Sequence, residues 1–263
     1  MDTKYWGPSG WSLLHLITIA EANPSPQQKK DIECFFSTLP YVLPCKYCRA
    51  SLSEYMLEHP LEKALESNKP YAIARWLWTI HNCVNAKLRS QRLHVLEDPP
   101  FSDVKARYIE RFKAGCTKTK FEGWEFLFSI IENHPYSKQS LSSVALPGAP
   151  EGDLTDLEKN RWNVLPPADR MQKLEQFWRC LPTVFPYAEW KTIWNTCSTD
   201  WSSRASSLKS LWQIRCKMES ELELLNKTNY HSLCFELKKH RSGCSKSKRA
   251  KTCRKKRAPK DHA

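Results

Sequence analysis

The stretch Pro44-Cys45-Lys46-Tyr47-Cys48 decides how the rest of this chain is interpreted. Two cysteines two residues apart, at the start of a predicted helix, can close an exchange-prone disulfide. The unpaired N–H groups and the dipole of a helix N-terminus also stabilise a thiolate. A lone Cys-x-x-Cys is found in metal sites too, so the pair by itself does not separate redox chemistry from zinc binding.

Two further motifs flank this pair. Upstream stands Trp6-Gly7-Pro8-Ser9-Gly10-Trp11-Ser12-Leu13-Leu14-His15, and downstream stands His81-Asn82-Cys83-Val84-Asn85-Ala86-Lys87-Leu88. A structural zinc ion needs four ligands, and the sequence has no second Cys-x-x-Cys or His-x-x-His to complete such a set. The sequence therefore favours redox chemistry, and we predict no metal site.

The composition predicts an all-α protein. The chain has 263 residues, enough for one large domain or two small ones with a buried core. Its 17 prolines and 7 glycines fit helices punctuated by proline, and no segment has the alternating pattern of a strand. We interpret most of the 11 tryptophans as packing anchors between helices, the alternative being walls around a flat cofactor.

The positive charge is concentrated at the C-terminal end. The formal net charge is +13, yet residues 238–263 hold twelve Lys or Arg and one acid, so the remainder is nearly neutral. Residues after Ser242 have no apolar periodicity, and we expect a disordered basic tail over 242–263. Such a tail could contact nucleic acid non-specifically, act as a nuclear import signal, or only increase solubility.

The sequence gives no indication of membrane insertion or secretion. No stretch has the roughly 20 apolar residues of a membrane-spanning helix. The N-terminus lacks the apolar region of a signal peptide, so the 11 cysteines are not expected to form a secreted disulfide scaffold. Because that count is odd, at least one thiol is free or pairs between chains.

Helical periodicity and caps place the predicted helices. Ser25-Pro26 is typical of a helix start, with Gln28 three residues after the cap. Ser137–Asp156 is predicted to be a linker. The predicted helices are 11–22, 26–39, 45–57, 70–88, 102–112, 121–133, 168–181, 187–196, 203–226 and 230–239.

The second half of the sequence echoes the first. Residues 35–48 align without gaps on residues 177–190, so that Cys45 and Cys48 correspond to Tyr187 and Trp190. Residues 10–14 align on 123–127, and 77–81 on 211–215, in the same order. We predict a degenerate repeat that keeps the helical packing and lacks the redox pair, the alternative being chance similarity between Trp-rich helices.

Together, the three motifs resemble the Erv/ALR family of FAD-dependent sulfhydryl oxidases, over about Tyr5 to Phe112. The resemblance implies a four-helix bundle plus a short fifth helix, within residues 1–116. A second helical domain would follow at 117–241. It also implies FAD as cofactor, protein dithiols as substrates, O2 as acceptor with H2O2 as product, and a homodimer.

The resemblance also assigns the site. Cys45, nearer the helix start, would exchange with substrate, and Cys48 would face the flavin. Aromatic, imidazole, amide and ammonium groups suit the rings and phosphates of FAD. The residues implied to bind it are Trp6, Gly7, Trp11, His15, His81, Asn82, Val84, Asn85, Lys87 and Leu88.

The sequence departs from the family pattern at several cysteines. Family members often carry a cysteine three residues before the motif histidine, where this chain has Trp78, so that structural disulfide is absent or replaced. We expect Cys34 and Cys83 to be buried thiols. Cys244 and Cys253 in the tail could act as a shuttle pair, although their spacing differs from Cys-x-x-Cys.

Two other functions compete with the oxidase. One is a nucleic-acid-associated or virion structural protein with a basic tail and an incidental Cys-x-x-Cys. The other is a flavin-free dithiol isomerase, which the lack of strands around Cys45 disfavours. With no targeting signal and an additional C-terminal domain, the chain resembles the family members of large cytoplasmic DNA viruses. This resemblance would place the protein in the host cytoplasm and the virion.

Overall fold

A computed structural model describes residues 1–93 and 96–241 of the chain, and these residues form helices and no strand. The predicted all-α class is therefore confirmed. The helices are α1 (Thr3–Ile19), α2 (Pro26–Phe36), α3 (Leu39–Val42), α4 (Lys46–Glu58), α5 (Glu62–Leu65), α6 (Ala72–Ser90), α7 (Phe101–Lys113), α8 (Trp124–Glu132), α9 (Lys138–Leu141), α10 (Asp156–Arg161), α11 (Pro167–Cys180), the 3₁₀ helix η1 (Leu181–Val184), α12 (Ala188–Asn195), α13 (Arg204–Glu221) and α14 (Tyr230–His240).

Helix α1 begins eight residues before the position expected from periodicity. Asp2 is its N-cap, and the Asp2 carboxylate accepts a hydrogen bond from the backbone N–H of Lys4. The helix continues through Pro8, which lies outside the predicted helix 11–22. The longer helix places Trp6 and Trp11 on one continuous element, so the whole upstream motif has a fixed geometry.

The start of α2 follows the sequence closely. Ser25 accepts a hydrogen bond from the Gln28 backbone N–H, and the Gln28 side chain accepts one from the Ser25 backbone N–H. This reciprocal capping box satisfies two N–H groups that a helix start leaves unpaired. The helix ends at Phe36, and Leu39–Val42 forms the separate short helix α3 instead of its last turn.

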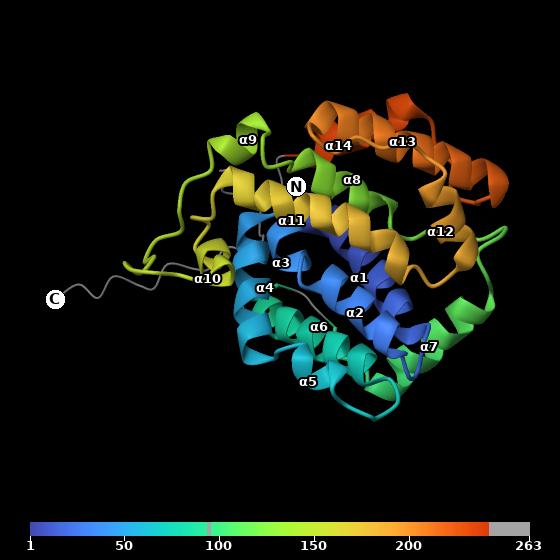
Figure 1. The fold of residues 1–263 in the computed structure, drawn as a ribbon, viewed down its shortest axis with the longest axis horizontal. Coiled ribbons are helices and arrows are strands. Elements are labelled where there is room, and N and C mark those ends of the chain that lie inside the picture. Colours follow the sequence, from blue (N-terminus) through green and yellow to red (C-terminus); the bar gives the residue numbers. More distant parts are fainter. Residues whose placement is uncertain (94–95, 242–263) are drawn as a thin grey trace.

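The two halves of the chain lie against each other across a broad contact (Figure 1). Helices α1 to α7 occupy one side, and α8 with α11 to α14 occupies the other. The main cross-contacts are α1 with α8, α4 with α10, and α11 with both α2 and α3. The rings of Phe35 in α2 and Phe177 in α11, which the repeat alignment pairs, lie 5.3 Å apart.

One continuous hydrophobic core runs through both halves. The same buried cluster includes Leu13 and Phe36 of the first half, and Phe126 and Trp178 of the second. Burial of this apolar surface is the main favourable term for folding, so each half is stabilised by the other. The predicted boundary at residue 116 separates two helical regions that share a core.

A short helix after the segment predicted to be a linker packs on the helix that carries the cysteine pair. The predicted linker contains the short helix α9, and α10 begins at its last residue and packs along α4 (Figure 1). The Asn160 side-chain amide donates to the Pro40 carbonyl oxygen at 2.8 Å and to Ser53 Oγ at 2.9 Å. Arg161 forms an ion pair with Glu54 at 2.8 Å. This part of the second half therefore braces α4.

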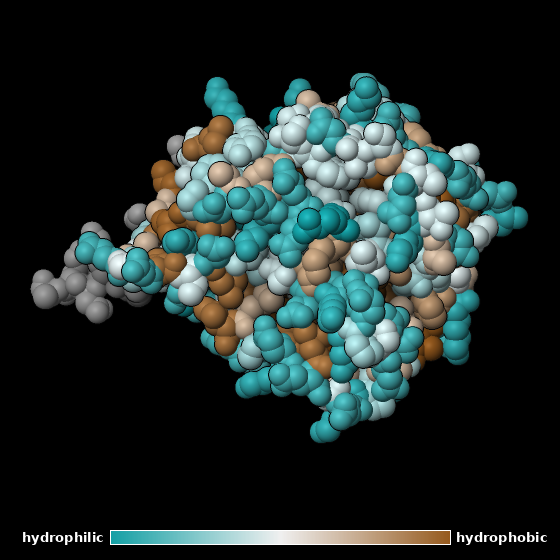
Figure 2. All heavy atoms as spheres, viewed as in Figure 1, coloured by the Kyte–Doolittle hydropathy of each residue, from teal (hydrophilic) through white to brown (hydrophobic). Residues whose placement is uncertain are grey.

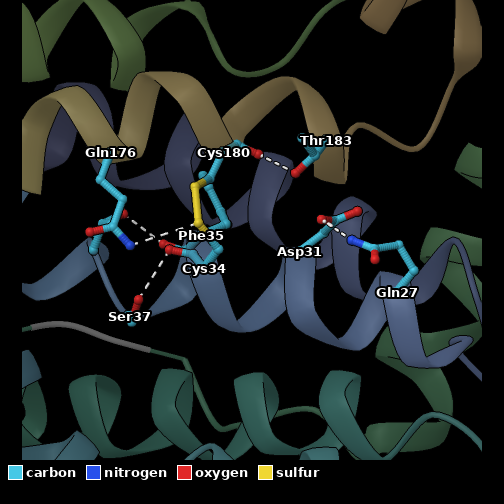
Figure 3. Close-up of a disulfide and its surroundings, with 9 residues drawn as sticks. Gln27, Asp31, Cys34, Phe35, Ser37, Gln176, Cys180 and Thr183 are labelled. Atoms are coloured by element: carbon cyan, nitrogen blue, oxygen red, sulfur yellow. Dashed lines mark hydrogen bonds between the residues drawn. A yellow bond between two sulfur atoms is a disulfide. The ribbon is translucent and has the colours of Figure 1, made fainter.

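A disulfide joins the two halves covalently. Cys34 in α2 and Cys180 at the end of α11 are bonded, although they lie 146 positions apart in the sequence (Figure 3). The expectation that Cys34 is a buried thiol is therefore wrong, because the second half brings a partner cysteine to it. Cys83 is half-buried rather than buried. The Cys34–Cys180 bond joins α2 to α11, whereas the family's usual structural disulfide would involve the position of Trp78 in α6.

The face shown in Figure 2 is mainly hydrophilic, with scattered apolar patches. Within the described residues, no helix is long and apolar enough to cross a membrane. The predicted basic tail, with Cys244 and Cys253, lies outside the described residues.

Candidate active site

The cysteine pair stands at the N-terminus of α4, as its sequence predicted. Cys45 is the N-cap residue of α4, and Cys48 lies in the first turn of the helix. The guanidinium group of Arg49 turns back and donates to the Leu43 carbonyl oxygen at 3.1 Å and to Asn163 Oδ1 at 2.8 Å. Arg49 is buried, so it fixes the turn that carries Cys45 against the second half of the chain.

A cavity of about 530 Å³ opens beside Cys48. Its volume is in the range of small-molecule and cofactor sites. Its walls come mainly from α1, α4 and α6, which hold the three motifs, with contributions from α7 and α8. Of the ten residues assigned to the cofactor from sequence, those that line the cavity are Trp6, Gly7, Trp11, His81, Val84, Asn85, Lys87 and Leu88.

Two assigned residues and one cysteine stand apart from the cavity wall. Asn82 and Cys45 do not line the cavity. His15 is buried behind the wall, where its Nε2 lies 3.0 Å from Nδ1 of His81 in a hydrogen bond. His15 is thus placed to orient His81 rather than to contact a ligand directly.

Trp11 and His81 form a parallel stack on the cavity wall. Their ring centroids are 3.9 Å apart, with 10° between the ring planes. The ring of Tyr108 from α7 stacks on that of His15, with 5.2 Å between their centroids. Flat rings arranged in this way present π surfaces to a flat aromatic ligand.

Burial keeps both histidines of this site neutral. Desolvation, together with a smaller effect of the nearby His81, lowers the pKa of His15 to about 3. Desolvation likewise lowers the pKa of His81 to about 4, against the opposing effect of the Asp98 carboxylate. At neutral pH the pair therefore shares one hydrogen bond between uncharged imidazoles, and neither ring carries a charge toward the cavity.

The polar side chains of α6 form hydrogen bonds with residues that lie outside the three sequence motifs. The Lys87 ammonium donates to Ser51 Oγ of α4. The Asn85 side-chain amide donates to Asp98 Oδ1 at 2.7 Å. Asp98 is also paired with Arg89, and this hydrogen bond is the main reason that the pKa of Asp98 is lowered. These contacts fix the side chains that border the cavity.

Sequence reasoning missed several residues of the site. Ser51, Tyr108 and Phe126 line the cavity, and Asp98 holds Asn85. Ser51 lies one helical turn after Cys48 on α4, so helical spacing carried a signal for it. Phe126 belongs to the second half of the chain, and no motif pointed to it.

The cavity wall holds a donor without a partner. The indole N–H of Trp6 is buried and has no hydrogen-bond acceptor among the described residues. A buried unpaired donor is costly, and a ligand with acceptor atoms would satisfy it. Lys4 and Lys87 also line the cavity, and ammonium groups of this kind can offset phosphate charge. The donor set thus fits an aromatic ligand that carries phosphates.

Within residues 1–93 and 96–241, no group of three or more His, Cys, Asp or Glu side chains is arranged to hold a metal ion. Fold and site together define a helical protein that sets a Cys-x-x-Cys helix against a cofactor-sized aromatic cavity. Residues 8–108 match the Erv1 / Alr family. The resemblance expected from the three motifs is thus confirmed over that segment.

Individual relatives agree with this match. A protein named "Probable FAD-linked sulfhydryl oxidase" from Acanthamoeba polyphaga mimivirus is 31% identical over 86 residues, 32% of this chain and 59% of its own length. A mitochondrial FAD-linked sulfhydryl oxidase of Saccharomyces cerevisiae is 32% identical over 92 residues, 35% of this chain and 47% of its own length. A protein of Invertebrate iridescent virus 3 is 28% identical over 94 residues, 35% of this chain and 62% of its own length.

The chain thus spans only about half to three-fifths of the length of these relatives. The similarity lies in its first half and does not extend to the helices that follow α7. No solved structure matches the chain.

Proposed function

We propose that this chain is a FAD-dependent sulfhydryl oxidase that forms disulfides in protein dithiols. The observation that carries the proposal is that Cys48 lines the same cavity as the stacked pair Trp11 and His81. This arrangement sets a redox-capable cysteine pair beside a site for a flat aromatic cofactor. The names of the relatives, which are FAD-linked sulfhydryl oxidases, support the choice of cofactor.

The residues present fit FAD. Trp11 and His81 offer aromatic faces, the Trp6 indole N–H offers a free donor, and Lys4 and Lys87 offer positive charge. The apolar side chains Val84 and Leu88 exclude water from the same wall. When bound, FAD supplies an acceptor for two electrons from the cysteine pair and returns them to an external acceptor.

The cysteine pair performs the exchange with substrate. A substrate thiolate attacks the Cys45 sulfur of a Cys45–Cys48 disulfide and forms a mixed disulfide, and Cys48 leaves as a thiolate. The second substrate thiol then attacks the mixed disulfide, which releases an oxidised substrate and the reduced Cys45. Two substrate thiols are thereby oxidised to one disulfide, the cysteine pair gains two electrons, and two protons are released.

The placement of Cys48 supports its role beside the flavin. Cys48 borders the cavity, whereas Cys45 does not. Cys45 is only 2% exposed, less than an exchange site on the surface would require. We therefore propose that the surface around Cys45 opens when a substrate docks, and that the Arg49 contact to Leu43 limits how far its turn moves.

The remaining features of the proposal rest on the family resemblance. We propose O2 as the external acceptor and H2O2 as product. The viral relatives support a viral origin, with action in the host cytoplasm and the virion. A homodimer remains part of the proposal, although α2 already packs on α11 within this chain. The rival function as a nucleic-acid-associated protein rests on residues outside the described part and is not favoured by the relatives.

Thiol-dependent oxygen consumption tests the proposal. Purified full-length protein should contain FAD and consume O2 when a dithiol is added. Cys45→Ser and Cys48→Ser should each abolish this activity, whereas Cys83→Ser, which alters a half-buried cysteine of α6, should retain it. Full activity in both Cys45→Ser and Cys48→Ser would overturn the proposal.

A further inference from the structure

We propose that the second half of the chain completes the cofactor cavity, and that Phe126 of α8 positions the cavity wall at Trp6 and Gly10. The inference rests on the proposed function, because it concerns the cofactor placed in that cavity. Phe126 lies outside residues 8–108, the segment that matches the family. Its side chain nevertheless lines the cavity together with Trp6 and Gly10 of α1.

The Phe126 ring rests directly on α1. Its centroid lies 5.9 Å from that of Trp6, and the side chain is fully buried. A Cβ atom at position 10 would lie only 3.1 Å from Phe126 Cδ2, closer than carbon atoms pack comfortably. Glycine at position 10 therefore allows the ring to lie against the backbone of α1, and this contact sets the wall at that point.

Polar contacts fix the start of α8 in the same place. The backbone N–H of Phe126 donates to Ser9 Oγ at 3.2 Å. The same Ser9 hydroxyl donates to the Glu122 carbonyl oxygen at 2.5 Å. Because one α1 side chain satisfies a donor and an acceptor at the start of α8, Phe126 is held at a defined position. Its ring is thus a fixed part of the wall.

The contact has a reciprocal counterpart. A Cβ atom at Gly123 would lie 2.8 Å from Leu13 Cδ2, and the repeat alignment pairs Gly10 with Gly123 and Leu13 with Phe126. Each half therefore places the residue three after its glycine against the other half's glycine, as in interfaces with twofold symmetry. The repeat itself stays a prediction, which these contacts support.

The two sides of this reciprocal contact differ in what they face. On the first side, Phe126 borders the cavity that Trp11 and His81 also line. On the second side, the counterpart of His81 is Arg215, whose guanidinium carbon lies 5.3 Å from the Trp124 ring centroid. Because the Phe126 side chain is fully buried behind Trp6, we infer that it acts on the flavin nucleotide by holding the Trp6 ring in the cavity wall.

A matched pair of substitutions tests this role in the full chain. Phe126→Leu removes the ring from the wall, whereas Phe128→Leu removes a ring on the same helix that is equally buried and does not line the cavity. Both should lower the melting temperature, because each leaves a void in the core. After removal of the flavin, FAD should rebind about two- to tenfold more weakly to Phe126→Leu. Phe128→Leu should bind FAD like the wild type.

The outcomes separate this inference from the proposed function. Equal FAD affinity in Phe126→Leu and Phe128→Leu, with tight binding by the wild type, would overturn the inference alone. A wild-type protein that neither contains nor rebinds FAD would overturn both. If Phe126→Leu does not fold, Phe126→Met carries the same test, since methionine fills irregular space with less loss of packing.

Discussion

The indole ring of Trp11 and the imidazole ring of His81 lie parallel, with their centroids 3.9 Å apart. The two residues come from α1 and α6, 70 positions apart, and both line the cavity beside Cys48. In the second half, Trp124 and Arg215 occupy the aligned positions and also lie together. The first half thus pairs two flat rings at a cavity, whereas the second half has the cation of Arg215 over the buried ring of Trp124.

Replacing Trp11 should weaken cofactor binding. Trp11→Leu removes one aromatic face and should reduce FAD affinity by about 1 kcal/mol, or about fivefold. Trp212→Leu is a matched control, because Trp212 is a half-buried tryptophan of α13 that packs on Tyr230 and does not line the cavity. Equilibrium titration of flavin-free protein with FAD measures the effect. Equal affinities of the two variants would contradict this role of Trp11.

Loss of the Cys34–Cys180 disulfide should destabilise the whole molecule. The bond closes a loop of 146 residues, and a cross-link of that span restricts the unfolded chain strongly. Cys34→Ser should therefore lower the free energy of unfolding by about 2–4 kcal/mol, measured by urea denaturation without reductant. Cys216→Ser, at an exposed cysteine, should change it little. Equal stability of the two variants would show that the cross-link contributes nothing.

Features that depend on residues close together in the sequence could be predicted. The capping box of Ser25 and Gln28 needs only residues three apart, and it formed as predicted. The motif residues on α1, α4 and α6 also met at one cavity, because helical spacing sets which side chains share a face.

Contacts between the halves could not be predicted in the same way. Cys180, Asn160 and Phe126 reach their partners from more than 100 residues away. No local pattern encodes such pairings, because they arise when apolar faces of distant helices are buried together. The packing of α10 along α4 is a contact of the same kind, and no pattern in the predicted linker before α10 indicated it.

The two buried histidines should make stability fall in mild acid. Because burial lowers the pKa of His15 to about 3 and that of His81 to about 4, the unfolded chain binds more protons than the folded one below about pH 6.5. Stability should therefore decrease as the pH falls from about 6.5 to about 4, by up to about 1.4 kcal/mol per pH unit for each histidine.

Urea midpoints measured from pH 7 to pH 4 test this dependence. His15→Gln should flatten the decline relative to the wild type, because it removes one of the two groups. His231→Gln, at an exposed histidine of α14, should leave the decline unchanged. A wild-type midpoint that is constant over this range would contradict the neutral buried pair.

The contact of Asn160 with α4 should matter for both stability and turnover. Asn160 is 1% exposed, and its amide donates to the Pro40 carbonyl oxygen and to Ser53 Oγ. Asn160→Ala removes both bonds from a buried site and should lower the free energy of unfolding by about 1–3 kcal/mol. Because α4 carries Cys45 and Cys48, the rate of thiol-dependent oxygen consumption should fall as well. Asn195→Ala, at an exposed position of α12, is the matched control, and equal urea midpoints for the two variants would mean that α10 does not brace the cysteine helix.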